Sequence, residues 1–200
     1  LSGRLNDNMA MMVKPLKCSS CGSPLKAKEA DLVLFCSACG KTMEFLDSDV
    51  GEISFHILVP NREDKDLIYL PFWGIDANVD VTHEDVVGGF LRITKKPMRG
   101  VCRFYVCAAD LLPRKTNGWN LEFTREFPKA SEISDFRSIP HMPALKSSKN
   151  AEKDAEFLFL KHEIDLSGTL QELEYTFSVV GHELYYIPFL RRGDDLTPAV

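Results

Sequence analysis

Residues 66–72 read DLIYLPF, and 117 positions later residues 183–189 read ELYYIPF. Leucine, tyrosine, proline and phenylalanine occupy the same places in both stretches. Each stretch follows a segment, residues 52–59 or 172–179, in which apolar and polar side chains alternate. Such alternation is typical of a strand with one buried face. The sequence therefore predicts the same pair of strands twice, as antiparallel hairpins over residues 52–73 and 172–190.

The two expected hairpins have predictable ends and a shared core. The Gly-His pair at 181–182 fits a two-residue turn. Proline cannot donate a hydrogen bond to a neighbouring strand, so Pro71 and Pro188 are expected at strand ends or sheet edges. Phe72 and Phe189 would then lie in the core beyond them. A two-stranded unit is not stable alone, so we expect a pseudo-twofold arrangement with one shared core. The alternative is that the similarity reflects only strand-like composition.

The segment between the two copies predicts further strands and one clear helix. Strands are expected at residues 86–94 (with a bulge at Gly88-Gly89), 101–109 and 121–127. Residues 128–149, rich in proline and serine, predict an irregular loop. Residues 151–164 have helical periodicity with Asn150 as N-cap, and their inward face comprises Ala155, Leu158, Phe159 and His162. The expected fold class is α+β, a mainly antiparallel β domain with a duplicated hairpin and one or two helices.

Four of the six cysteines form two matching motifs, CSSCG at 18–22 and CSACG at 36–40. Zn²⁺ prefers four soft ligands in a tetrahedron, and two C-x-x-C pairs supply four thiolates. The glycine after each pair lets the backbone turn toward the sulfurs. We therefore predict a closed, structural Zn²⁺ site held by Cys18, Cys21, Cys36 and Cys39. The alternatives are two disulfides, an iron ion in the same four-thiolate site, or a C-x-x-C redox centre.

Residues 14–45 resemble a zinc ribbon in their four cysteines and in Gly22 and Gly40. Ribbon knuckles often carry proline after the first cysteine, and here that position is Ser19 or Ser37. The resemblance implies a small module over residues 14–46 whose fold depends on its ion. The segments with Tyr-Leu-Pro-Phe-Trp and Tyr-Tyr-Ile-Pro-Phe are also similar to those of uncharacterised bacterial proteins with an N-terminal zinc ribbon. That resemblance implies an intracellular bacterial protein and no particular activity.

The expected organisation is a flexible tail over residues 1–13, the ribbon over 14–46, a short linker at 47–51 and a β-rich α+β domain over 52–200. The remaining cysteines, Cys102 and Cys107, lie five apart on an expected strand. They would point to opposite faces and could not bind one metal together. We interpret them as core residues.

The charge of the chain is uneven. The net charge is −5, from 24 basic and 29 acidic residues. Residues 14–45 nevertheless carry five lysines against three acidic residues, so the negative excess lies in the rest of the chain. An acidic body opposes docking on a phosphate backbone. These five lysines are the candidates for a nucleic-acid contact: Lys14, Lys17, Lys26, Lys28 and Lys41.

No local motif indicates catalysis. The chain contains no H-E-x-x-H, G-x-S-x-G, G-x-x-x-x-G-K or G-x-G-x-x-G sequence. His162, on the apolar face of its helix, is interpreted as a core residue rather than a ligand. No apolar run is long enough to span a membrane, and the first residues lack the apolar core of a secretory signal.

The favoured function is therefore a cytoplasmic, zinc-binding, non-enzymatic scaffold with a protein partner or self-association. The first alternative is nucleic-acid binding through the ribbon. The second is an enzyme whose catalytic residues are assembled from distant parts of the larger domain.

Overall fold

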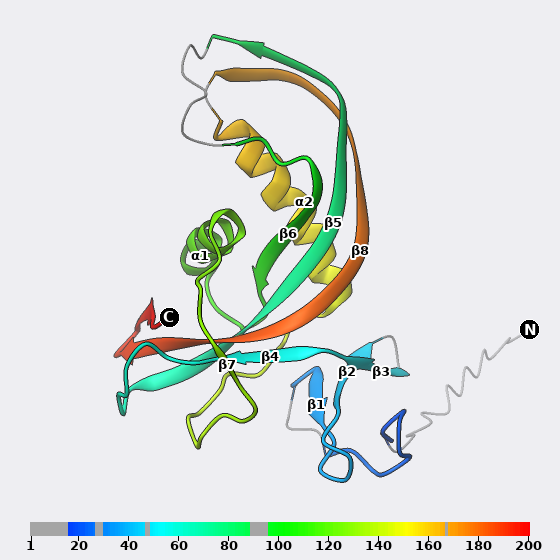
Figure 1. Cartoon of the computed structure of the whole chain (residues 1–200), viewed down its shortest axis with the longest axis vertical. Coiled ribbons are helices and arrows are strands. Elements are labelled where there is room, and N and C mark those ends of the chain that lie inside the picture. Colours follow the sequence, from blue (N-terminus) through cyan, green and yellow to red (C-terminus); the bar gives the residue numbers. More distant parts are fainter. Residues whose placement is uncertain (1–15, 27–29, 47–48, 89–95, 167) are drawn as a thin grey trace, which may run out of the picture.

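The fold was obtained as a computed structural model that describes residues 16–26, 30–46, 49–88, 96–166 and 168–200. The expected tail at 1–13 lies outside these residues, as does most of the expected strand at 86–94. The described chain forms two mostly antiparallel sheets and two helices, as Figure 1 shows. This confirms the α+β class. Neither described helix is long and apolar enough to cross a membrane.

Two very long strands form the centre of the larger sheet. β5 (Leu67–Val87) and β8 (Thr169–Arg192) pair antiparallel along their whole length and bend together (Figure 1). The order of strands is β6-β5-β8-β4-β7, with β9 also on β8. Only β4 runs parallel to its neighbour β8. The shorter strands are β4 (Phe55–Leu58), β6 (Gly100–Cys107), β7 (Glu132–Ile133) and β9 (Asp195–Pro198).

The prediction of two hairpins is wrong, because the two similar stretches pair with each other. Leu70 lies opposite its counterpart Ile187, Tyr69 lies opposite Pro188, and Pro71 lies opposite Tyr186. A local twofold axis therefore passes between Leu70 and Ile187 and exchanges the two copies. The expected pseudo-twofold relation is present, but within one pair of strands rather than between two hairpins.

The turn expected at Gly181-His182 is also absent, and the described residues of the expected linker belong to a strand. β8 continues through Gly181, where Asp76 faces Gly181 and Ala77 faces Val179. The extra residue makes a β-bulge, which bends the strand without reversing it. The expected strand over residues 52–59 is split at Ser54: its first part ends β3 (Asp49–Ile53), and its second part is β4. The linker expected at 47–51 thus supplies three residues of β3.

The two prolines occupy strand interiors rather than strand ends. The carbonyl oxygen of Pro71 accepts a bond from Ala108 N, and that of Pro188 accepts one from Ala199 N, both at 2.8 Å. A residue in an antiparallel strand presents its N–H and C=O to the same side. Each proline therefore turns its missing N–H away from the β5–β8 ladder, and no bond between these strands is lost.

The prediction of a strand at 121–127 is also wrong, because these residues belong mainly to helix α1 (Pro113–Arg125). Proline at the first helical position has its φ angle preset for a helix and lacks only an N–H that would have no intrahelical partner. Thr116, Asn120 and Phe123 are buried, and their spacing of four and three places them on one helical face. Tertiary packing on that face outweighs the strand-like alternation at 121–127.

Helix α2 (Ser148–Ile164) matches the expected helix, with one correction at its start. The N-cap is Ser147, whose hydroxyl accepts a hydrogen bond from Asn150 N at 3.3 Å, so Asn150 lies inside the helix. The inward face is as predicted, with Ala155, Leu158 and Phe159 buried. Residues 128–149 are largely irregular, apart from the two-residue strand β7 and the start of α2.

Each face of the large sheet has its own core. On one face α2 packs through Phe159 over a cluster that includes Trp73 and Tyr186. On the other face α1 packs through Phe123 over a cluster that includes Phe72 and Phe189. The strand β6 contributes to both cores, with Cys102 packed against the first and Cys107 within the second. The prediction of opposite faces for these two cysteines is confirmed.

Phe72 and Phe189 lie at the centre of the second core, fully buried as predicted, with their rings stacked at a centroid distance of 6.0 Å. Phe72→Ala and Phe189→Ala should each lower the free energy of unfolding by about 3–5 kcal/mol, the range for buried phenylalanines. Urea denaturation followed by tryptophan fluorescence would measure the loss. Phe157→Ala is the matched control, because Phe157 is 64% exposed. Equal small effects for all three variants would contradict the described core.

Candidate metal centre

Two knuckles with the same backbone geometry carry the four N-terminal cysteines. Gly22 N donates to Cys18 O at 2.9 Å, and Gly40 N donates to Cys36 O at 2.8 Å. Both glycines have a positive φ, +71° and +74°, a conformation that other residues adopt only with strain. The C-x-x-C-G sequence thus accounts for the local fold of each knuckle, because its glycine closes the turn beneath the sulfurs.

The four sulfurs converge on one point. Sγ of Cys18 lies 3.6 Å from Sγ of Cys39, and Sγ of Cys21 lies 3.6 Å from Sγ of Cys36. All four sulfurs lie within 4.8 Å of one another. A tetrahedral zinc with Zn–S bonds of about 2.3 Å separates its sulfurs by about 3.8 Å, whereas a disulfide requires about 2.05 Å. The four cysteines are free thiols placed compatibly with one tetrahedral ion, and the disulfide alternative loses its support.

A small three-stranded sheet supports the knuckles. Its strands are β1 (Val33–Phe35), β2 (Thr42–Leu46) and β3, in that order. From β3, Glu52 accepts hydrogen bonds from Ser20 Oγ at 2.7 Å and from Lys41 Nζ at 2.8 Å, so it links the two knuckles. Hydrogen bonds from Ser23 lower the pKa of the Cys21 thiol to about 6. We call the described residues of 16–53 the cysteine unit.

Two buried carboxylates attach the cysteine unit to the larger sheet and its helices. Glu44, on β2, is 3% exposed and accepts hydrogen bonds from Ser148 N at 2.7 Å and Ser148 Oγ at 2.8 Å. Ser148 is the first residue of α2, so the carboxylate lies at the positive end of the helix dipole. Asp31 accepts from Val33 N and from Ala144 N in the same way, at 3.0 and 3.2 Å. The unit that carries the four-cysteine cluster is therefore hydrogen-bonded to the start of α2.

Apolar contacts strengthen this attachment. Val33 belongs to the same buried cluster as Trp73 and Phe159. The ring of Phe35 packs edge-on against Phe55 and Phe136, with centroids 5.4 and 6.0 Å away. The two sheets thus share part of one core, which the sequence did not predict.

Sequence reasoning missed a second polar cluster, on the α1 face of the large sheet. Arg103 donates to both oxygens of Asp76, at 2.7 and 2.6 Å, and to Glu183 at 3.0 Å. Tyr185 accepts a bond from Arg103 and donates to Glu183 at 2.9 Å. The ring of His56 stacks on Tyr185 with centroids 4.7 Å apart.

The cluster is an ion-pair network centred on Arg103. Hydrogen bonding to Asp76 raises the pKa of Arg103, and burial raises the pKa of Tyr185. Both groups therefore keep their protons at neutral pH. Gly74 makes the room, because a Cβ there would lie 2.8 Å from the Tyr185 ring. The residues come from four strands, so no local motif could have revealed them.

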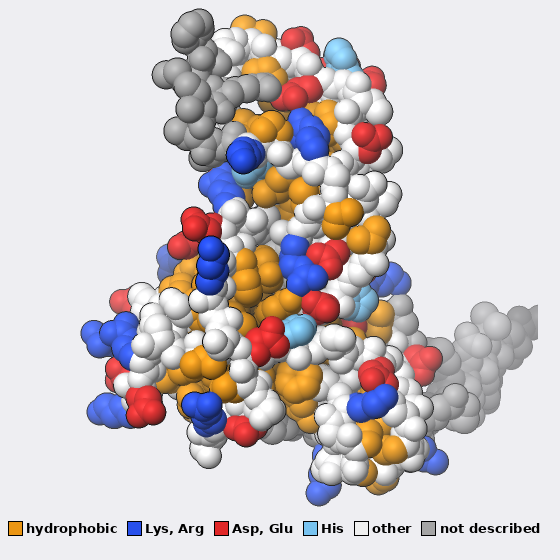
Figure 2. Space-filling model, viewed as in Figure 1, with side chains coloured by type: hydrophobic (Ala, Val, Ile, Leu, Met, Phe, Trp, Pro, Cys, Tyr) orange, Lys and Arg blue, Asp and Glu red, His pale blue; other side chains and the backbone are white. Residues whose placement is uncertain are grey.

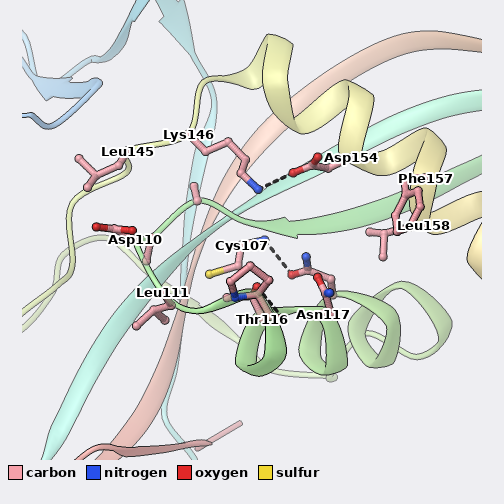
Figure 3. Close-up of a pocket in the computed structure, with 14 residues that line it drawn as sticks. Cys107, Asp110, Leu111, Thr116, Asn117, Leu145, Lys146, Asp154, Phe157 and Leu158 are labelled. Atoms are coloured by element: carbon pink, nitrogen blue, oxygen red, sulfur yellow. Dashed lines mark hydrogen bonds and ion pairs between the residues drawn. The ribbon is translucent and has the colours of Figure 1, made fainter.

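A cavity of about 420 Å³ lies between α1 and α2, and Figure 3 shows its lining. Lys146 and Asp154 form an ion pair at its rim, and Asn120 Oδ1 accepts a bond from Cys107 N at 2.9 Å. Burial raises the pKa of the Cys107 thiol to about 12. Since the thiolate is the reactive form, Cys107 is not an activated nucleophile.

The other residues singled out in the sequence are placed as follows. His162 is buried with Nε2 2.9 Å from Lys96 O and with Arg125 Nε donating to Nδ1 at 3.2 Å, so it is a satisfied core residue as predicted. Of the five candidate lysines, Lys14 and Lys28 lie outside the described residues. Lys17 and Lys26 are exposed, and Lys41 is paired with Glu52.

Comparison with known proteins finds no family model, curated protein or solved structure that matches this chain. The four-cysteine cluster is consequently the feature from which a function can be argued.

Proposed function

We propose that this protein is a zinc-binding, non-enzymatic scaffold in which a zinc ribbon holds one structural Zn²⁺ through Cys18, Cys21, Cys36 and Cys39. The observation that carries the proposal is the convergence of the four sulfurs from two knuckles of identical backbone geometry. Four thiolates close the coordination shell and leave no position for a reactive water, so the ion would stabilise structure rather than catalyse.

The attachment of the ribbon supports a scaffolding role. Glu44 connects the strand that follows the second knuckle to the start of α2. A metal that fixes the ribbon would thereby fix the position of α2 on the large sheet, and a rigid surface is what a binding partner needs. A thiolate site is best maintained in a reducing compartment, which agrees with the proposed cytoplasmic location in a bacterial cell.

Metal analysis of the full chain tests the proposal. We expect one zinc per chain by inductively coupled plasma mass spectrometry after growth with both zinc and iron. Cys39→Ser should lose the zinc, because three thiolates bind much more weakly than four. Cys102→Ser is the matched control and should keep it, since Cys102 lies on β6. A protein with no zinc, or with iron in its place, would refute the zinc assignment.

Nucleic-acid binding through the ribbon is expected to fail at physiological salt. The positive charge of the five lysines is partly offset, because Lys41 pairs with Glu52. The acidic body repels phosphate groups that come within about 8 Å, the distance beyond which salt screens the charges. In a gel-shift assay we expect no submicromolar complex with DNA or RNA. A submicromolar complex that weakens as salt rises would instead support the nucleic-acid alternative.

A further inference from the structure

Part of one edge of the large sheet is covered by side chains. On β6, the backbone N–H groups of Tyr105 and Cys107 point away from β5 and donate to Thr124 Oγ1 and Asn120 Oδ1, both at 2.9 Å. Both acceptors belong to α1. Exposed edges invite pairing with other chains, and proteins commonly cover them in this way.

The edge of β8 is different. It is covered by β4 at residues 184–186 and by β9 at residues 189–192. Over residues 169–183, however, β8 pairs only with β5 in the described part of the chain. In Figure 1 this stretch runs beside β5 from the upper end of the bent pair of strands down past the label β8.

The register shows which backbone groups face outward. Backbone groups of successive strand residues point alternately to the two sides. The backbone groups of Tyr105 and Cys107 point away from β5. When the pairing is followed from β6 through β5 to β8, the N–H and C=O groups of Tyr175, Phe177 and Val179 also point away from β5. We call this row of backbone groups, residues 173–179, the open edge. It is a ready template for one more strand.

The charge beside the open edge is strongly negative. Residues 76–87 of β5 and 169–183 of β8 contain seven carboxylates and no lysine or arginine. Arg103 pairs with two of them, Asp76 and Glu183, and Arg99 pairs with Glu84. Among the described residues no lysine or arginine pairs with the other four, which are Asp80, Asp85, Glu172 and Glu174.

These four carboxylates share one face. Asp85 lies opposite Glu172, and Leu173 and Phe177 pack toward α2, so Glu172 and Glu174 point to the face away from α2. Asp80 lies opposite Thr176 on the same face. Figure 2 shows acidic side chains at the upper end of these strands. Farther along the same strand Val180, at the bulge, is 62% exposed and offers an apolar contact.

We propose that the open edge of β8 binds an extended, lysine- or arginine-bearing segment of a partner protein by β-strand addition. Main-chain hydrogen bonds to Tyr175, Phe177 and Val179 would give affinity, and alternate basic side chains would meet Glu172 and Glu174. A second copy of this chain fits less well, because two acidic faces would repel each other. The inference rests on the proposed scaffold function and names its partner class.

Fluorescence anisotropy of the full chain with a labelled peptide of alternating lysine and threonine tests this proposal. We expect binding that weakens with added salt. Glu172→Gln with Glu174→Gln should weaken it about tenfold, because two charge pairs are removed. Methylating alternate backbone nitrogens of the peptide should abolish binding without altering the protein. Glu122→Gln with Glu126→Gln, at the exposed end of α1, is the matched control and should change nothing.

Three outcomes would overturn the proposal. The first is equal binding of the methylated peptide, which would mean that only net charge is recognised. The second is equal binding of the corresponding glutamate–threonine peptide, which would remove the role of the carboxylates. The third is a dimer in sedimentation that Glu172→Lys disrupts, which would make the edge a self-association surface. Zinc content is measured on the same sample: failure of peptide binding with zinc present refutes this inference alone, whereas absence of zinc refutes the proposed function.

Discussion

Cys36→Ser is expected to abolish metal binding and unfold the cysteine unit while the larger sheet stays folded. Cys36 is buried and is one of the four proposed ligands. A structural zinc supplies about 10–16 kcal/mol to the folding of small zinc modules. Loss of the ion removes the reason for the two knuckles to stay together. Amide resonances of residues 16–46 should collapse toward random-coil positions in an NMR spectrum.

The same variant should also weaken the larger unit. Val33 lies in the shared core, and Glu44 holds Ser148, so unfolding of the cysteine unit exposes the start of α2. Hydrogen exchange at the first turn of α2 should accelerate, while exchange in the central part of β5 and β8 stays slow. Cys102→Ser is the control and should leave both regions protected. If the amide resonances of residues 16–46 kept their chemical-shift dispersion in Cys36→Ser, that result would contradict a metal-dependent fold.

Glu44→Ala should lower the free energy of unfolding by about 3–5 kcal/mol. The carboxylate makes two buried hydrogen bonds to Ser148, and bonds to a charged group contribute about 1.5–3 kcal/mol each. Its removal also leaves a buried N–H and hydroxyl without this partner. Urea denaturation at fixed zinc concentration would measure the change.

Two variants separate the causes of that loss. Glu44→Gln keeps the shape and an acceptor oxygen but removes the charge at the helix N-terminus, an interaction of about 0.3–1 kcal/mol or somewhat more when buried. We expect its effect to be clearly smaller than that of Glu44→Ala. Glu122→Ala, on the exposed side of α1, should have little effect. A loss below about 1 kcal/mol for Glu44→Ala would show that Ser148 is satisfied without the carboxylate.

Local patterns predicted the parts of the molecule that are determined locally. The knuckles follow from cysteine and glycine spacing because every ligand lies within a few residues of its turn. Helix α2 and strand β6 follow from periodicity because each buries one continuous face. The similarity of the two Tyr-x-Pro-Phe stretches correctly indicated a twofold relation, since residues such as Tyr69 and Tyr186 are both fully buried.

The choice of strand partners could not be predicted in the same way. Alternation describes a strand equally well in a hairpin with its neighbour and in a long ladder with a distant one, so it did not distinguish a turn from a bulge at Gly181. The network of Arg103 with Asp76 and Glu183 depends on that same long-range register. Helix α1 was missed because the alternation within 121–127 is also typical of a strand. Its buried helical face can be recognised only when the residues from 116 onward are considered together.

X-ray absorption at the zinc edge on the purified full chain tests the central claim most directly. The account predicts a single shell of four sulfur atoms at about 2.3 Å from zinc, with no nitrogen or oxygen neighbour. That result would assign Cys18, Cys21, Cys36 and Cys39 together as the closed ligand set. A mixed shell of sulfur with oxygen or nitrogen, or a protein that retains no zinc, would contradict it.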